Sequence, residues 1–155
     1  MKVGSRDDLV YSMILVALVI VYASSSGNAL YLGYWYLIGV PVAMLLPGLM
    51  LSAQALFLTG TTVATIVTLV VYMAIVSALG RDGGLVGLGH LFSAPGMFIG
   101  VCISAWLLRS RVSTSVPWIV AGIAFLGAGL GFMIAQVIVC TTAMYCGALS
   151  FGVWG

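Results

Sequence analysis

Few residues in this chain could carry out chemistry, and they are far apart in the sequence. They are one histidine, three acids and three cysteines: His90, Asp7, Asp8, Asp82, Cys102, Cys140 and Cys146. An enzyme needs a nucleophile beside a base, a pair of carboxylates, or a metal. No lysine or acid falls within a long apolar run to activate a serine, and no glycine-rich phosphate loop with its lysine is present. The inventory therefore predicts a protein that is not an enzyme.

The cysteines and the histidine do not have the spacing of a metal site. One histidine without a nearby acid cannot complete a tetrahedral set of ligands, so we predict no metal and no cofactor. Cys102 lies mid-way along an apolar run, where a thiol behaves as a small apolar group. Cys140 and Cys146 lie after the last apolar run. They can form a disulfide in an oxidising compartment if 141–146 is a loop, but not across a continuous helix, where residues six apart point to different faces.

His90 has two interpretations. Ionisable groups inside a membrane usually serve a proton relay or a ligand site. His90 also follows the loop "GRDGG" at 80–84 by a few residues, which would place it at the outer interface with water or headgroups as partners. Because all three acids are expected outside the spans, a relay would lack its partner. The interfacial position is therefore favoured.

The overall composition identifies the class of protein. Hydrophobic residues make up 63% of the 155 residues and charged residues only 5%, whereas soluble domains have about 25% charged residues. The mean hydropathy is +1.28. We therefore expect an integral membrane protein whose immediate partner is the lipid bilayer. A net charge of +2 without a basic patch excludes nucleic acid as a partner.

The few charges divide the chain into uncharged runs at 9–80, 83–108 and 112–155. A helical span needs about 20 apolar residues, and continuous runs such as "MILVALVIVY" lack the alternation of β-barrel strands. We predict an all-α, polytopic transmembrane helix bundle that forms one membrane domain over 1–155. Its five predicted spans are 9–23, 34–57, 61–79, 87–108 and 117–139. The turn between the second and third, "TGTT" at 59–62, is weakly marked, so four or six spans remain open.

Lysine and arginine predict the orientation, because they accumulate on the cytoplasmic side. Lys2 and Arg6 place the N-terminus inside, and Arg109 and Arg111 place the loop after the fourth span inside as well. Four intervening spans satisfy both, which leaves the C-terminus outside, in a bacterial cytoplasmic (inner) membrane. Alternatively, 9–22 is the apolar part of a cleaved signal peptide, which would reverse the parity; Asp7 and Asp8 beside it argue against that.

Small residues recur every four positions in the fourth and fifth spans. The two trios are Gly96, Gly100 and Ser104, and Gly127, Gly131 and Ala135. Each four-residue step turns only about 40° around a helix, so each trio forms one narrow stripe. Such stripes allow close helix contact in lipid. We expect the two spans to pack on each other, with a partner protein as the alternative occupant of either stripe.

Two glutamines and three prolines interrupt the apolar runs. Gln54 and Gln136 are expected to hydrogen-bond across helices; Gln136 lies opposite the Gly127 stripe and so would face another helix or a partner. Pro41, Pro47 and Pro95 each remove one helix hydrogen bond. Ser93 could alternatively cap a shorter helix that begins at 94, and such broken helices are a feature of transporter sites.

The aromatic residues gather near the predicted span ends. Tyr31, Tyr34, Trp35 and Tyr36 precede the second span, and amphipathic rings prefer the headgroup level. We therefore interpret this cluster as an interfacial anchor.

Two functions fit this inventory. The first is a non-catalytic membrane protein that acts by lateral helix contact, either as an accessory subunit of a membrane complex or as an immunity protein against a membrane-acting, pore-forming toxin. The second is a small uncoupled permease or channel built on the kinked spans that contain Pro41, Pro47 and Pro95, where backbone carbonyls would line the path.

Overall fold

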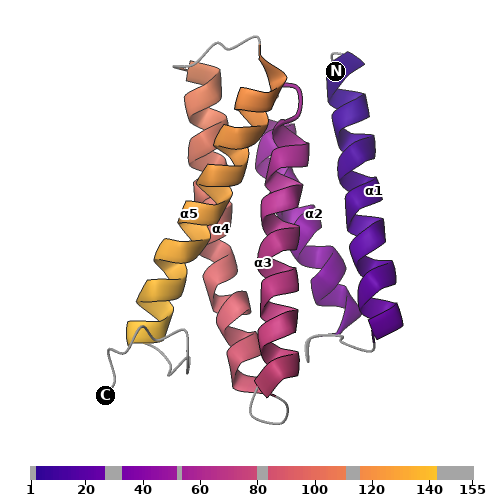
Figure 1. The fold of residues 1–155 in the computed structure, drawn as a ribbon. Helices are drawn as coiled ribbons and strands as arrows, with labels where there is room; N and C mark the ends of the chain where they lie inside the picture. Colours follow the sequence, from indigo (N-terminus) through magenta and orange to yellow (C-terminus); the bar gives the residue numbers. More distant parts are fainter. Residues whose placement is uncertain (1–2, 27–32, 52–53, 80–83, 111–115, 143–155) are drawn as a thin grey trace.

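The computed structural model describes residues 3–26, 33–51, 54–79, 84–110 and 116–142. Within these ranges the chain forms five α-helices and no strand. They are α1 (Val3–Ser26), α2 (Tyr34–Met50), α3 (Phe57–Leu79), α4 (Gly84–Ser110) and α5 (Pro117–Thr142). Successive helices run in opposite directions, so α1 begins at the end of the bundle where α4 ends and α5 begins (Figure 1).

Four of the helices are long and apolar enough to cross a membrane. The qualifying stretches are Arg6–Ser25, Phe57–Ala78, Leu88–Ser110 and Pro117–Thr142. The remaining helix, α2, has 17 residues and spans about 26 Å at 1.5 Å per residue. The predicted all-α architecture of apolar, membrane-length helices is therefore confirmed.

The boundary between the second and third helices differs from the prediction. The segment predicted as one span over 34–57 ends at Met50, and the "TGTT" sequence predicted as a turn lies inside α3, which starts at Phe57. The connection instead lies between Met50 and Phe57, and within it Leu56 has a φ of 65°, a conformation that is uncommon for a residue other than glycine. The start of α3 is fixed by Asp8 of α1, whose carboxylate accepts hydrogen bonds from the N–H groups of Leu58 and Thr59.

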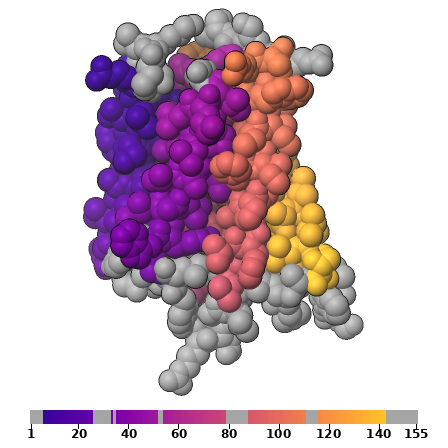
Figure 2. Space-filling model, turned by 180° about the vertical axis from the view of Figure 1, so that it is seen from behind, coloured from indigo at the N-terminus to yellow at the C-terminus, as the bar shows by residue number. Residues whose placement is uncertain are grey.

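Helix α3 is the central element, since it contacts each of the other four helices. Its buried residues Phe57 and Leu69 join Leu37 of α2, Met97 of α4 and Val120 of α5 in one apolar core. The most extensive contact in the bundle is between α4 and α5. Figure 2 shows α1, α2, α4 and the lower part of α5 side by side on the opposite face of the molecule.

Candidate functional site

A cluster of polar and aromatic side chains surrounds His90 in the interior of the bundle. The His90 side chain has no exposed surface, although it was predicted at the outer interface. Tyr36 of α2, Thr68 and Tyr72 of α3, and Phe132 of α5 surround it. The expectation of water or headgroup partners is wrong, because three other helices close over this turn of α4.

The hydrogen bonds determine which nitrogen of His90 carries the proton. The Thr68 hydroxyl has a single hydrogen and donates it to the Thr65 carbonyl at 2.8 Å. Thr68 can therefore only accept from His90 Nε2, which lies 3.1 Å from its oxygen. Nε2 consequently carries a proton, and in the neutral ring Nδ1 accepts a hydrogen bond from the Tyr36 hydroxyl. Tyr36 is itself buried, which corrects its interpretation as an interfacial anchor, whereas its neighbour Trp35 is 88% exposed.

Aromatic rings complete the walls of the cluster. The Tyr72 ring meets the imidazole edge to face with centroids 5.0 Å apart, and the Phe132 ring lies at 4.9 Å. Tyr72 and Phe132 also contact each other. These rings exclude solvent from the imidazole of His90. Both imidazole nitrogens are hydrogen-bonded to uncharged side chains, those of Tyr36 and Thr68. This arrangement ties α2, α3 and α4 together and leaves no free lone pair on His90 to act as a base or a metal ligand.

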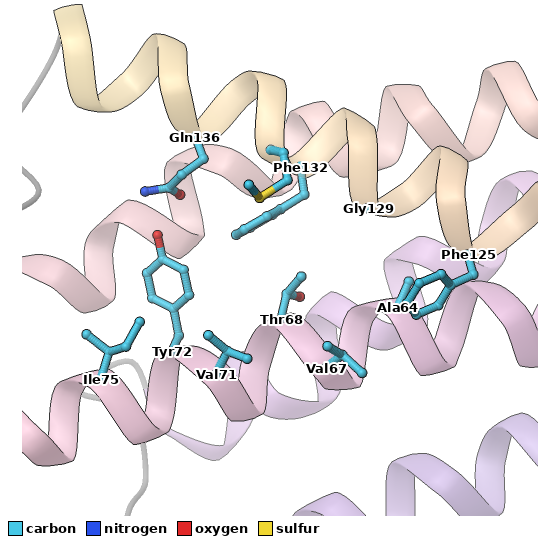
Figure 3. Close-up of a pocket in the computed structure, with 11 residues that line it drawn as sticks. Ala64, Val67, Thr68, Val71, Tyr72, Ile75, Phe125, Gly129, Phe132 and Gln136 are labelled. Atoms are coloured by element: carbon cyan, nitrogen blue, oxygen red, sulfur yellow. The ribbon is translucent and has the colours of Figure 1, made fainter. Parts of the chain in front are cut away.

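Gln136 faces the interior of the bundle. Its Oε1 accepts a hydrogen bond from the Ser93 hydroxyl at 2.7 Å, and its Nε2 donates to Cys140 Sγ at 2.8 Å. The Tyr72 hydroxyl points towards the same amide (Figure 3). The expectation that Gln136 faces away from the fourth helix is therefore wrong, since Ser93 lies on α4. The single hydrogen of the Ser93 hydroxyl is shared between Gln136 Oε1 and the Gly89 carbonyl, which lies 2.8 Å from the Ser93 oxygen. Ser93 does not cap a shorter helix, because α4 continues through Pro95.

A second polar assembly lies where α1 meets the start of α3. Asp8 was expected outside the spans, but it lies within α1 and is 2% exposed. One carboxylate oxygen accepts the Leu58 N–H at 2.9 Å. The other accepts the Thr59 N–H at 2.9 Å and the Thr59 hydroxyl at 2.5 Å. Leu58 and Thr59 are the second and third residues of α3, whose N–H groups a capping side chain normally satisfies. Asp8 therefore caps α3 from a different helix, and its negative charge lies at the positive end of the α3 dipole.

The remaining predicted polar and charged residues have the following positions. Gln54 lies in the α2–α3 connection and donates to the Leu108 carbonyl at the end of α4 at 3.1 Å. Arg6 and Arg109 are exposed at the same end of the bundle. Lys2 and Arg111 lie outside the described residues.

The cysteines differ in their state. Cys140 is in a disulfide bond, whereas Cys102 is a free thiol. Cys146, the partner expected from the sequence, lies outside the described residues.

The structure brings the two stripes of small residues together in the seam between α4 and α5. A Cβ atom added to Gly100 would lie 3.0 Å from the Gly127 carbonyl carbon and 3.2 Å from the Gly131 Cα. One added to Gly127 would overlap the Ser104 hydroxyl, and one added to Gly96 would overlap Ala135. Real Cβ atoms almost never approach this closely, so the helices have this separation only because side chains are missing there.

Two apolar grooves open on the surface of the bundle. The seam groove has a volume of about 710 Å³ and follows α4 and α5 on the side where their large side chains are exposed. Its exposed ridges are Phe92, Ile99 and Ile103 on α4, and Leu126, Leu130, Ile134 and Ile138 on α5. The second, which we name the α3–α5 wedge, has a volume of about 260 Å³. Its lining is Ala64, Val67, Thr68, Val71, Tyr72, Ile75, Phe125, Gly129, Phe132, Met133 and Gln136 (Figure 3).

Among the described residues, no group of three or more His, Cys, Asp or Glu side chains is placed to hold a metal ion. The prolines leave the helices continuous, since Pro41 and Pro47 lie inside α2 and Pro95 inside α4. What the described arrangement supports is helix association and the binding of apolar molecules.

Comparisons with protein-family models, with curated proteins and with solved structures found no match to this chain.

Sequence reasoning missed Tyr36, Thr68, Tyr72 and Asp8 as members of buried polar assemblies. The sequence of α3 does contain one pattern that indicates a buried polar face. Thr61, Thr65, Thr68 and Tyr72 are spaced by four, three and four residues, which puts them on one face of a helix. Polar groups on one face of an otherwise apolar span indicate where that span meets other helices, and His90 is bound on this face.

Proposed function

We propose that this chain is a non-catalytic, five-span protein of the bacterial cytoplasmic membrane that acts by lateral helix contact with another membrane protein. In the cell, this role would be that of an accessory subunit of a membrane complex or of an immunity protein against a pore-forming toxin. The N-terminus would be cytoplasmic, and α1 would remain part of the folded bundle because Asp8 caps α3.

The seam groove is the observation that carries this proposal. From Phe92 to Leu107 it follows α4 for about 22 Å at 1.5 Å per residue, which is most of the ~30 Å hydrocarbon core. Two ridges of large aliphatic side chains border a floor of small residues. An apolar helix can place its own ridge into such a groove, and close contact over small residues is how helices associate in lipid. The glycines already hold α4 against α5, so a partner would bind over the seam and not in place of either helix.

The polar chemistry of the bundle agrees with a non-catalytic role. His90 is hydrogen-bonded at both nitrogens, and Asp8 is engaged by the start of α3. Each group therefore satisfies buried hydrogen-bonding positions in neighbouring helices and has no reactive position open to a substrate.

Site-specific photo-crosslinking in the native membrane tests this proposal. A photoreactive phenylalanine analogue would replace Leu130 on a seam ridge or, as the control, Ile14 on α1, which is similarly exposed but far from the seam. We expect the Leu130 position to give one protein adduct in stoichiometric yield and the Ile14 position to give none. The proposal fails if neither position captures a protein and the purified chain conducts solute in liposomes. Loss of that flux on Pro95→Ala or His90→Ala would favour the permease.

A further inference from the structure

The disulfide at Cys140 is enclosed in the contact between α5 and the rest of the bundle. Cys140 lies in the last turn of α5, which ends at Thr142, and its side chain is 1% exposed. Its sulfur accepts a hydrogen bond from Gln136 Nε2 at 2.8 Å. The chain has three cysteines and Cys102 is a free thiol, which leaves Cys146 as the other cysteine of the chain.

Gln136 connects this sulfur to α4. A disulfide sulfur has no hydrogen, so it can only accept, and it therefore turns Nε2 of the amide towards Cys140 and Oε1 towards the Ser93 hydroxyl. Gln136 is 3% exposed and Ser93 has no exposed surface. The sulfur is consequently part of the buried hydrogen bonding by which α5 packs on α4.

Making or breaking a disulfide requires direct attack on one of its sulfurs, through a mixed disulfide in either direction. Because Cys140 is buried, neither oxidant nor reductant can reach its sulfur while α5 is packed on α4. Attack on the other sulfur would release the Cys140 thiolate as a buried charge, which is costly. The forward and reverse reactions share this barrier, so the bond must form before the packing is complete, and the packing then protects it.

The position of Cys140 along the bundle agrees with exposure to oxidants during assembly. α5 ends at the opposite end of the bundle from the exposed Arg6 and Arg109 (Figure 1). Arginines mark the cytoplasmic side of a membrane protein, and disulfides form on the other side, in the periplasm or a comparable oxidising compartment. Two unrelated features therefore place the same end of the bundle outside.

We propose that oxidation of Cys140 is an assembly step of this protein, in which a thiol–disulfide oxidase on the outer side forms the bond before α5 closes against α4. Two cysteine thiols lose two protons and two electrons, one sulfur–sulfur bond forms, and the disulfide of the oxidase is reduced to a dithiol. The inference rests on the membrane orientation in the proposed function but not on the contact at the seam groove, so the two fail separately.

Thiol counting tests the order of events in cells. A maleimide polymer, added in SDS after the reductant is removed, increases the mass by one step for each free thiol. Dithiothreitol given before synthesis of the chain is induced should leave three free thiols. The same reductant given after synthesis should leave one, that of Cys102, because the closed bundle shields the bond. In purified chain, reduction should be about tenfold slower or more in mild detergent than in SDS, since exchange depends on access to the sulfur.

Two glutamines supply a matched pair of variants. Gln136→Leu removes the amide beside Cys140, whereas Gln54→Leu removes an amide that donates to the Leu108 carbonyl at the opposite end of the bundle. In mild detergent, Gln136→Leu should speed reduction by about two- to tenfold, the range of one hydrogen bond. Gln54→Leu should leave the rate unchanged. Unfolding curves would show that both variants are folded.

Four results would overturn the proposal. They are three free thiols in the chain isolated without reductant, reduction in mild detergent as fast as in SDS, equal acceleration by the two glutamine variants, and a disulfide-linked dimer in place of a bond within one chain.

Discussion

At the scale of single residues, the buried polar side chains of Asp8, His90 and Ser93 each hydrogen-bond to a group on another helix. Asp8 and His90 looked isolated in the sequence because their partners are about 50 residues away or on other helices. In an apolar interior an unsatisfied donor or acceptor costs more than a completed hydrogen bond contributes. These three side chains lie where helices meet at a fixed position, and they help to specify the pairing of helices that are largely apolar elsewhere.

Asp8→Ala tests this interpretation. The substitution leaves the N–H groups of Leu58 and Thr59 without their buried acceptor, so we expect it to lower the free energy of unfolding by about 2 kcal/mol. Unfolding in mixed detergent micelles by titration with a denaturing detergent measures the change. Asp7→Ala is the control, because Asp7 is exposed beside it and should change stability by less than about 0.5 kcal/mol. Equal effects of the two substitutions would contradict a capping role.

At the scale of elements, the seam between α4 and α5 depends on missing side chains. Lipid provides no hydrophobic drive for two apolar helices to associate, so their contact rests on van der Waals packing at short range. Gly100, Gly127 and Gly131 allow that range. The same substitution should therefore have opposite effects on a glycine inside the seam and on one outside it.

Gly100→Ala and Gly122→Ala make this comparison. A methyl group at position 100 meets the backbone of Gly127, and overpacking of this kind typically costs about 1–3 kcal/mol. A methyl group at position 122 meets nothing within 4 Å, and alanine should stabilise the helix by up to about 1 kcal/mol. The same detergent titration should show changes of opposite sign. A stabilising Gly100→Ala would show that the seam is looser than described.

At the scale of the whole molecule, the direction of the helices relates the charges to the membrane. Arg6 near the start of α1 and Arg109 near the end of α4 are at the same end of the bundle. Both belong on the cytoplasmic side if arginines mark that side. This arrangement requires α2 to cross, although its ~26 Å length is below the ~30 Å of a hydrocarbon core. A short span of this kind can be matched by local thinning of the bilayer.

Reporter fusions test the crossing of α2. With five spans, alkaline phosphatase fused after Gly155 should be active and a fluorescent protein at the same position should be dark. The fluorescent protein fused after Ser110 should be bright, because that point follows four spans. A bright fusion after Gly155 would mean that α2 does not cross or that another span is missing.

The sequence by itself determined the class of the protein, the helical nature of its apolar runs, and the spacing of the small residues that meet in the α4–α5 seam. These properties follow from composition and from the period of the helix, which are local. Tertiary structure alone decided that Asp8 caps α3, that His90 is enclosed by Tyr36, Thr68 and Tyr72, and that α3 begins at Phe57 and not after "TGTT". Each of these depends on which helix faces which. The hydropathy pattern of an almost uniformly apolar chain does not contain that information, because in lipid every apolar face is equally acceptable and only the polar contacts and close backbone approaches distinguish one arrangement from another.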